Sequence, residues 1–353
     1  MQKTRASHFV PQAYLRRWAG SDLKLWCYRL LVSHNAVPKW KRHSIRGMAY
    51  QEHLYTTLVG TEESDEFEHW IEEEFETPGQ EAIEKAASNG RLTPQDWRAI
   101  VRYAAAQDVR TPARYYENVQ RWNVQLPQMI QEVLNDSVEK WEAADEDERK
   151  VLLASRDPEA DAMAFPFRVA VTPTPAEGGG IITAETVPGR QMWISSMRLL
   201  LSRTIRALLK HRWSFVLAPD GVSWLTSDDP VIRLNYKSAS EYDFGGGWGS
   251  QGSDIIFPLS PTHLLFTQIG HRHPDRIRRE ADVAEKIQRL VAEHAHRWIY
   301  AQLPQNPRRS RVIDSGRFLE EAQARARWHK EQTAAQLALG QSPPRQPYSH
   351  DGA

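Results

Sequence analysis

The sequence predicts an α+β fold: a central, largely antiparallel sheet from N- and C-terminal strands, a helical insertion, and a C-terminal helical tail. Three observations support this expectation. Period-two apolar patterns occur near both ends of the chain, helical apolar spacing fills the middle, and the chain becomes polar and rich in proline from Pro304. We therefore expect one α+β domain over residues 1–303. The remainder, 304–353, should be a polar tail with one amphipathic helix and a disordered end.

The N-terminal region is expected to be extended and then helical. SDLKLWCYRLL (21–31) predicts a strand because apolar residues recur with period two, and SIRGMAYQEHLYTTL (44–58) predicts a second extended segment. Residues 64–88 then change to helical apolar spacing, interrupted at Pro78-Gly79.

The clearest helix is expected to begin at Thr93. This threonine suits an N-cap, Pro94 suits the first helical position, and Asp96 lies in the first turn. Pro112 should end or kink this helix, and a second helix should follow it.

Two expectations concern the middle of the chain. EGGGIITAE (177–185) is expected to be a loop, and residues 189–212 are expected to be helical. This second segment is basic and holds no acidic residue.

The C-terminal region then predicts β-structure. Strand candidates lie within WSFVLAPDG (213–221), VSWLTSDDPVIRLN (222–235) and SDIIFPLSPTHLLFTQI (253–269). A helix is expected over roughly 279–295, followed by a last strand in RWIYAQL (297–303).

Composition restricts the class of protein. The formal net charge is zero, so no global field directs the protein to nucleic acid or membrane. Cys27 is the only cysteine, which excludes a disulfide framework within the chain. No apolar segment approaches the roughly 20 residues that span a bilayer. We expect a cytoplasmic protein with no membrane partner, whose oligomeric state the sequence does not indicate.

Charge is unevenly distributed along the chain. Residues 1–50 carry ten Lys/Arg against one Asp, and residues 51–90 carry twelve Asp/Glu against one Lys. Blocks of opposite charge usually face each other or serve separate surfaces.

Several short motifs occur in a fixed order. They are His8-x-x-Pro11-Gln12-x-Tyr14-Leu15-x-x-Trp18, Arg110-Thr111-Pro112, WLTSDDP (224–230) and FPLSP (257–261). Together they resemble the signature of the domain-of-unknown-function 4238 family, which usually has Phe where this chain has Trp18. The resemblance covers about residues 7–303. It implies a bacterial, sometimes fungal, cytoplasmic protein and brings no established activity.

Three residues of these motifs are the catalytic candidates. His8 lies on an expected extended arm and could act as a general acid or base, or could hydrogen-bond to backbone and fix the N-terminus. Arg110 could clamp a phosphate or carboxylate, or could pair with Asp108 or with a glutamate of the acidic helix. Asp228 follows a strand, where it could orient the histidine or hold a divalent cation, or could belong to a turn.

Substrate-binding and metal candidates are weaker. Gln12 and Tyr14 belong to the opening signature, and Arg198 and Arg206 lie on the basic segment. That segment, 190–212, could bind nucleic acid, or its charges could face the acidic helices. A divalent cation is an open alternative that no motif supports. The pairs His271/His273 and His294/His296 do not have convincing spacing for a metal site.

Three functions therefore stay open. The first is a hydrolase acting on a phosphodiester or nucleotide, with His8, Arg110 and Asp228 around one cavity. The second is a non-enzymatic module that binds nucleic acid or protein through the basic helix 190–212 and the N-terminal arm. The third is a buried polar network in which the same three residues organise the fold.

Overall fold

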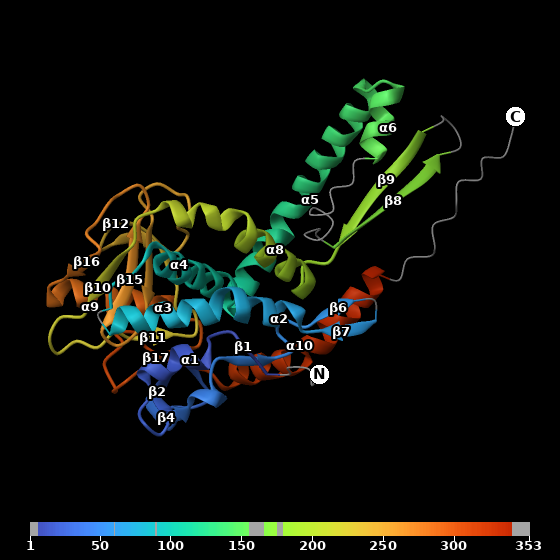
Figure 1. The fold of residues 1–353 in the computed structure, drawn as a ribbon. Helices are drawn as coiled ribbons and strands as arrows, with labels where there is room; N and C mark the ends of the chain where they lie inside the picture. The colour runs from blue at the N-terminus through green and yellow to red at the C-terminus, as the bar shows by residue number, and fades with distance from the viewer. Residues whose placement is uncertain (1–5, 60, 89, 155–165, 175–178, 341–353) are drawn as a thin grey trace, which may run out of the picture.

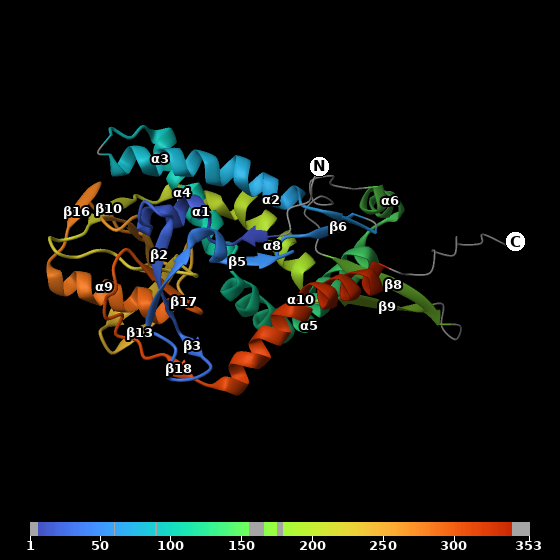
Figure 2. The ribbon, with the colours of Figure 1, turned by 90° about the horizontal axis from the view of Figure 1, so that it is seen from below.

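Figures 1 and 2 show the computed structural model, which describes residues 6–59, 61–88, 90–154, 166–174 and 179–340. The α+β class predicted from the sequence is confirmed. The strands of the two larger sheets gather at one end of the body, and a helix pair with a β-ribbon projects from the other end as an arm (Figure 1).

One antiparallel sheet joins the two ends of the chain. Its order is β11 (Thr226–Ser227), β17 (Trp298–Ala301), β2 (Lys24–Arg29) and β4 (Trp40–Ser44). The expectation that N- and C-terminal strands share a sheet is therefore confirmed.

Most C-terminal strands form a second sheet instead of extending the first. Its order is β13 (Glu241–Asp243), β12 (Ile232–Ser238), β14 (Asp254–Pro258), β15 (His263–Gln268), β10 (Ser214–Leu217) and β16 (Arg276–Arg278). The chain changes sheets at Asp228-Asp229-Pro230, between β11 and β12. Proline has no backbone N–H for a strand ladder, which favours ending the first strand there.

The helical insertion follows the capping signals in the sequence. The Thr93 hydroxyl accepts from the backbone N–H of Asp96 (3.2 Å), and the Asp96 carboxylate accepts from the N–H of Thr93 (2.6 Å). This reciprocal cap begins α4 (Pro94–Val109), and Pro112 occupies the first position of α5 (Pro112–Ala143).

Pro78 does not break the acidic helical region, because it lies in the first turn of α3 (Thr77–Ala87). The chain runs into α3 from α2 (Glu66–Ile71) through a π-helical turn. The π-helical turn before Pro78 alters the hydrogen-bond pattern where the proline has no N–H to donate, so the helical path continues.

The expectation of a loop over 177–185 is wrong where the chain is described. Gly179–Thr186 form β9, which pairs antiparallel with β8 (Phe167–Thr174). Ile181, Ile182 and Thr183 are β-branched and favour a strand despite the preceding glycines. This ribbon, α6 (Glu146–Ala154) and the distal part of α5 make up the arm (Figure 1).

The predicted helix over 189–212 is shorter than expected. It forms α8 (Arg190–Ser202), followed by 3₁₀ turns at Thr204–Arg206 and Leu208–Lys210. The helix over 279–295 is confirmed as α9 (Ala281–His294).

The C-terminal tail contacts the body. β18 (Val312–Ile313) pairs with β3 (Leu31–Val32), and α10 (Ser315–Gly340) runs from that pair toward the arm (Figure 2). Trp328 of α10 is 7% exposed and packs edge-on against Tyr115 at 5.6 Å. The end of the tail, expected to be disordered, lies outside the described residues.

The core is rich in buried tryptophan, and several of the indole groups donate to backbone carbonyls. Trp18 donates to the carbonyl of Trp224 (2.7 Å), and Trp193 donates to that of Val109 (3.2 Å). None of the described helices has the length and apolar character to cross a membrane.

Candidate functional site

The opening signature is built into the core. Pro11 precedes α1 (Gln12–Leu15), where Gln12 is half-buried and Tyr14 is fully buried. The Tyr14 hydroxyl donates to the carbonyl of Pro258 (2.5 Å) and lies 2.6 Å from the hydroxyl of Thr226. Burial raises the Tyr14 pKa well above its ordinary value. The signature thus contacts the FPLSP and WLTSDDP segments directly.

His8 ends β1 (Ala6–His8), which pairs with β5 (Tyr50–Glu52). Its Nε2 lies 3.3 Å from the carbonyl of Arg46, and its ring lies 5.7 Å from that of Tyr50. Burial lowers the His8 pKa below 6.5, which favours the neutral imidazole at neutral pH. The Arg46 contact is the backbone anchor that we considered as the alternative to catalysis.

Arg110 lies at the end of α4 and is 3% exposed. Its Nη2 donates to the backbone carbonyl of His8 (2.6 Å), its Nη1 pairs with Glu76, and its Nε donates to the Tyr55 hydroxyl (3.3 Å). The pairing with a glutamate of the acidic region, one of the two simpler alternatives, is confirmed. Each guanidinium nitrogen therefore already has a partner within the protein.

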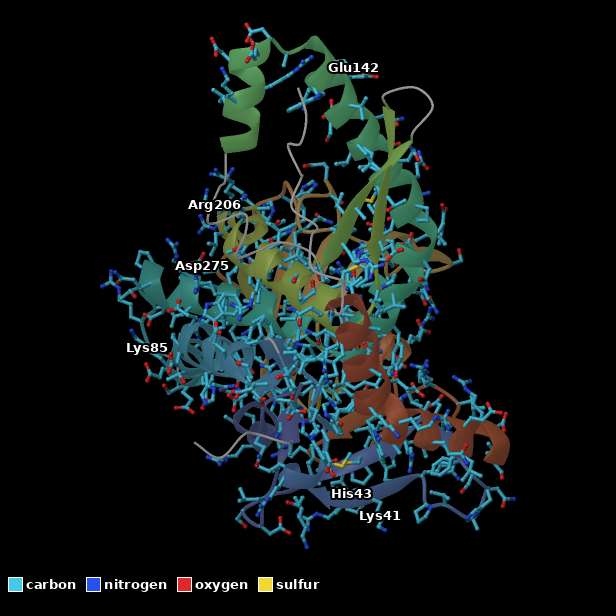
Figure 3. All side chains as sticks on the ribbon, turned by 90° about the vertical axis from the view of Figure 1, so that its right-hand side faces the viewer. Lys41, His43, Lys85, Glu142, Arg206 and Asp275 are labelled. Atoms are coloured by element: carbon cyan, nitrogen blue, oxygen red, sulfur yellow. The ribbon has the colours of Figure 1, made fainter. Side chains whose placement is uncertain are left out.

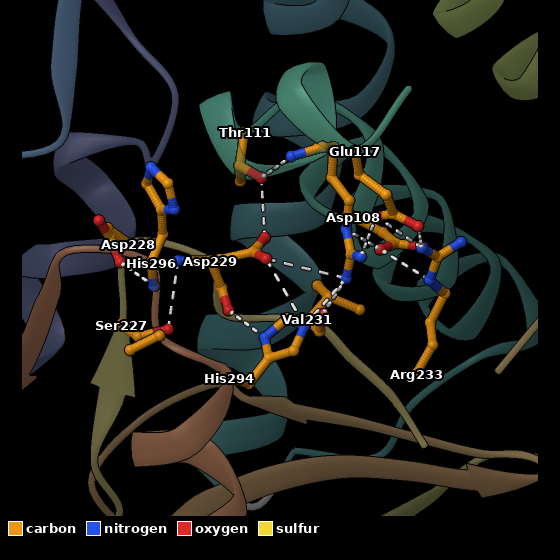
Figure 4. A network of polar contacts seen from close by, with 12 residues as sticks. Asp108, Thr111, Glu117, Ser227, Asp228, Asp229, Val231, Arg233, His294 and His296 are labelled. Atoms are coloured by element: carbon orange, nitrogen blue, oxygen red, sulfur yellow. Dashed lines mark hydrogen bonds and ion pairs between the residues drawn. The ribbon is translucent and has the colours of Figure 1, made fainter. Parts of the chain in front are cut away.

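Asp228 follows β11 and is 2% exposed. Its Oδ1 accepts from the backbone N–H of His296 (3.0 Å), and its Oδ2 accepts from that of Arg297 (2.9 Å). Burial raises the Asp228 pKa to about 7. The carboxylate thus holds the turn between α9 and β17 (Figure 4).

The neighbouring Asp229 belongs to a buried ion-pair network (Figure 4). Its Oδ1 accepts from the Thr111 hydroxyl (2.7 Å), and its Oδ2 lies 3.9 Å from Arg114 Nη2 and 3.5 Å from His294 Nε2. Burial alone would raise the Asp229 pKa, but the charges of Arg114 and His294 and the Thr111 hydrogen bond hold it below its ordinary value.

Arg114 links Asp229 to a second buried carboxylate. Its Nε lies 3.2 Å from Asp108 Oδ1, and its Nη2 donates to the carbonyl of Val231 (3.1 Å). The other oxygen of Asp108 accepts from the indole of Trp248 (2.7 Å). We name Asp108, Thr111, Arg114, Asp229 and His294 the junction network.

Of the three catalytic candidates, only His8 and Arg110 are joined by a hydrogen bond among the described residues. Arg110 contacts His8 through the backbone carbonyl, while Asp228 uses its carboxylate oxygens on backbone amides at 296 and 297. Catalysis by His8, Arg110 and Asp228 stays a prediction. The contacts favour structural roles for Arg110 and Asp228, while one network of all three residues also stays a prediction.

The basic segment divides into two parts. Arg198 of α8 pairs with Glu66 (3.2 Å), so its charge faces the acidic region, as in the simpler alternative. Arg206 is exposed in the turn after α8 (Figure 3).

A basic cavity of about 670 Å³ lies beside the segment that follows α8 in the chain. The start of α4 and the segments 209–213 and 270–275 line it. Its charged and imidazole side chains are those of Arg98, Lys210, His211, Arg212, His271, Arg272 and Asp275. Asp275, labelled in Figure 3, accepts from Arg212 at 2.7 Å. Trp97 also lines the cavity and is half-buried.

Comparison with known proteins identifies the family. Residues 7–304 match the model of a family described as a protein of unknown function, DUF4238. The chain belongs to this family. A search of curated proteins and a search of solved structures each find no match. The family match ends before β18 and α10.

The sequence reasoning missed most of the junction network. Arg114 was not singled out, His294 was considered only as a metal ligand together with His296, and Asp108 was considered only as a partner of Arg110. One signal was available: AAAQDVRTPARYY (104–116) places three charges in an otherwise apolar stretch. Buried charges need partners, so such a stretch predicts ion pairs without identifying them.

Replacing His8 by alanine is expected to have a small effect on stability. The variant keeps the backbone carbonyl that Arg110 binds and loses the imidazole contact to Arg46. We expect a loss of about 1 kcal/mol, which thermal melting would report as a shift of about 2 °C. A collapse of the fold would contradict this assignment. Loss of phosphodiester hydrolysis at unchanged melting temperature would support the catalytic prediction instead.

Proposed function

We propose that this protein binds single-stranded nucleic acid in the basic cavity. The observation that carries the proposal is the charge of the lining: Arg98, Lys210, Arg212 and Arg272 against one carboxylate. That carboxylate, Asp275, is already paired with Arg212. Phosphate groups are the common polyanionic partner of such a surface, since guanidinium groups bind phosphate oxygens through two parallel hydrogen bonds.

Two features favour a strand over a free phosphate. Exposed Arg276 and Arg278 lie on β16, the edge strand of the six-stranded sheet, next to the Asp275 rim of the cavity. We expect these cations to contact the phosphates that flank the cavity. Trp97 offers an aromatic wall, and a base stacked on an aromatic side chain contributes about 1–3 kcal/mol.

This proposal relocates the binding surface expected from the sequence. Arg198 of α8 is engaged by Glu66, so the surface comes from residues after that helix and from the 270–279 segment. Hydrolysis of the bound strand stays a separate prediction. The same labelled oligonucleotides, incubated with magnesium or manganese, test it.

Charge reversal in the cavity is expected to weaken binding. Fluorescence anisotropy with a labelled single strand of about 12 nucleotides should give a dissociation constant that rises between about 50 and 200 mM salt. Lys210→Glu with Arg272→Glu should weaken binding at least about tenfold. A duplex of the same length should bind less tightly, because its bases cannot reach Trp97.

The matched control reverses two lysines on the arm. Lys140 and Lys150 are exposed, and each pairs with an acidic neighbour on its own helix. Lys140→Glu with Lys150→Glu changes the net charge by the same amount as the cavity variant. Equal weakening in both variants, or binding that does not respond to salt, would refute the proposal.

A further inference from the structure

Three side chains with the chemistry of metal ligands lie together where α10 meets the body. They are His53 in the turn after β5, Glu63 in β7 (Glu62–Ser64), and His329 in α10. One ligand atom of each lies within 4.8 Å of the other two, and all three residues are half-buried. None of them belongs to the junction network or lines the basic cavity.

We propose that His53, Glu63 and His329 bind a divalent transition-metal ion, with Zn²⁺ as the preferred ion. Two imidazole nitrogens and one carboxylate form a ligand set that zinc accepts, with water completing a tetrahedral site. Ligands about 2.0–2.1 Å from zinc lie about 3.4 Å apart. Atoms 4.8 Å apart must therefore approach one another by about 1.4 Å, which side-chain rotation can supply.

The local backbone brings the ligands together from separate elements. His53 has φ = 55°, in the left-handed region that residues other than glycine seldom adopt. Its ring stacks on that of His329 at 3.9 Å and 11°. Pairing of β7 with β6 (Thr57–Val59) sets Glu63 opposite Leu58 in the adjacent hairpin.

Arg190 determines which ring nitrogen of His329 carries the proton. Its Nη1 lies 2.9 Å from His329 Nδ1, while His329 Nε2 lies 3.1 Å from Glu63 Oε1. Without an ion, Nδ1 accepts from the guanidinium and the Nε2 proton points to the carboxylate. An ion at Nε2 replaces that proton, which moves to Nδ1, so the imidazole stays neutral.

The Arg190 guanidinium keeps other acceptors when this happens. Its Nη1 also donates to the carbonyl of His53 (3.1 Å), and its Nη2 donates to the Thr333 hydroxyl (3.2 Å). Its positive charge opposes the ion, so affinity should be lower than in a cysteine-rich structural zinc site. The bound ion would connect α10 to the β6–β7 hairpin.

The test measures zinc binding to the full chain after removal of metal with EDTA. Titration calorimetry with zinc chloride should give one ion per chain, and saturating zinc should raise the melting temperature. His53→Ala, Glu63→Gln and His329→Ala should each weaken binding at least about tenfold. Cobalt(II) offers an independent absorption signal for the same site.

His69→Ala is the matched control, because His69 lies 3.6 Å from Asp65 in an ordinary exposed pair. Zinc binding should survive this substitution. Glu63→Gln keeps the side-chain shape, so it tests the site even if His329→Ala loosens α10. Absence of stoichiometric binding of zinc, cobalt, nickel or manganese would overturn the proposal. So would binding by Glu63→Gln equal to that of the wild type.

Discussion

Arg114→Ala is expected to destabilise the protein by about 3–5 kcal/mol, a fall of about 6–10 °C in melting temperature. The guanidinium lies 3.2 Å from Asp108 and 3.9 Å from Asp229, and both carboxylates are almost fully buried. Removing the arginine leaves two buried acids without their shared cation. Desolvation of such groups is costly unless they become protonated.

The Arg114→Ala defect should depend on pH. In the wild type the Asp229 pKa is held low, so its contribution to stability is present above the unfolded value and is lost as the pH falls. Without Arg114, burial should raise the pKa of the carboxyl above its unfolded value. The variant then loses stability as the pH rises, and its deficit should be smaller at pH 5 than at pH 8.

Arg121→Ala is the control for this experiment. Arg121 lies on the same helix, α5, and is exposed. Its loss should change the melting temperature by about 1 °C or less. A similar small change in Arg114→Ala would show that the junction network does not stabilise the fold.

Asp228→Ala is expected to cost about 3–5 kcal/mol as well. Two part-buried backbone N–H groups, at His296 and Arg297, lose their acceptor, and leaving such a group unpaired costs about 1–3 kcal/mol. Melting temperature should fall by about 6–10 °C. Asp228→Asn should be intermediate, because its carbonyl can accept one N–H while its own NH₂ opposes the other.

Asp228→Ala also distinguishes a structural role of Asp228 from a catalytic one. Removing a catalytic group usually leaves stability unchanged or raises it. An unchanged melting temperature together with loss of phosphodiester hydrolysis would favour the hydrolase prediction. Asp220→Ala, at an exposed turn, is the matched control and should have little effect.

Local signals predicted much of the fold. The Thr93-Pro94-Asp96 cap and Pro112 located helix boundaries because capping involves residues a few positions apart. The β8–β9 ribbon was missed because glycines were given more weight than the β-branched residues that follow them. The change of sheet after Ser227 depends on pairing with residues some 70 positions later, which periodicity does not encode.

The candidate site was harder to predict for a different reason. The sequence correctly indicated that Arg110 has a specific partner. Of the two partners considered, Asp108 and a glutamate of the acidic helix, the glutamate is correct. His8 shows the limit of prediction from sequence, because its contact with Arg110 uses a backbone carbonyl that any residue would supply. Several pairs of the junction network join residues far apart in the sequence, such as Thr111 with Asp229, which are 118 positions apart. A single sequence contains no local pattern for them.

The sheet that joins both ends of the chain has a consequence for synthesis on the ribosome. β2 pairs with β4 early, but its other edge must wait for β17, about 270 residues later. Translation at about 5–20 residues per second makes this delay on the order of tens of seconds. During that time the nascent chain exposes an unpaired strand edge, which is a template for aggregation. Production of this protein should therefore respond to chaperone supply, and fragments that end before residue 298 should aggregate.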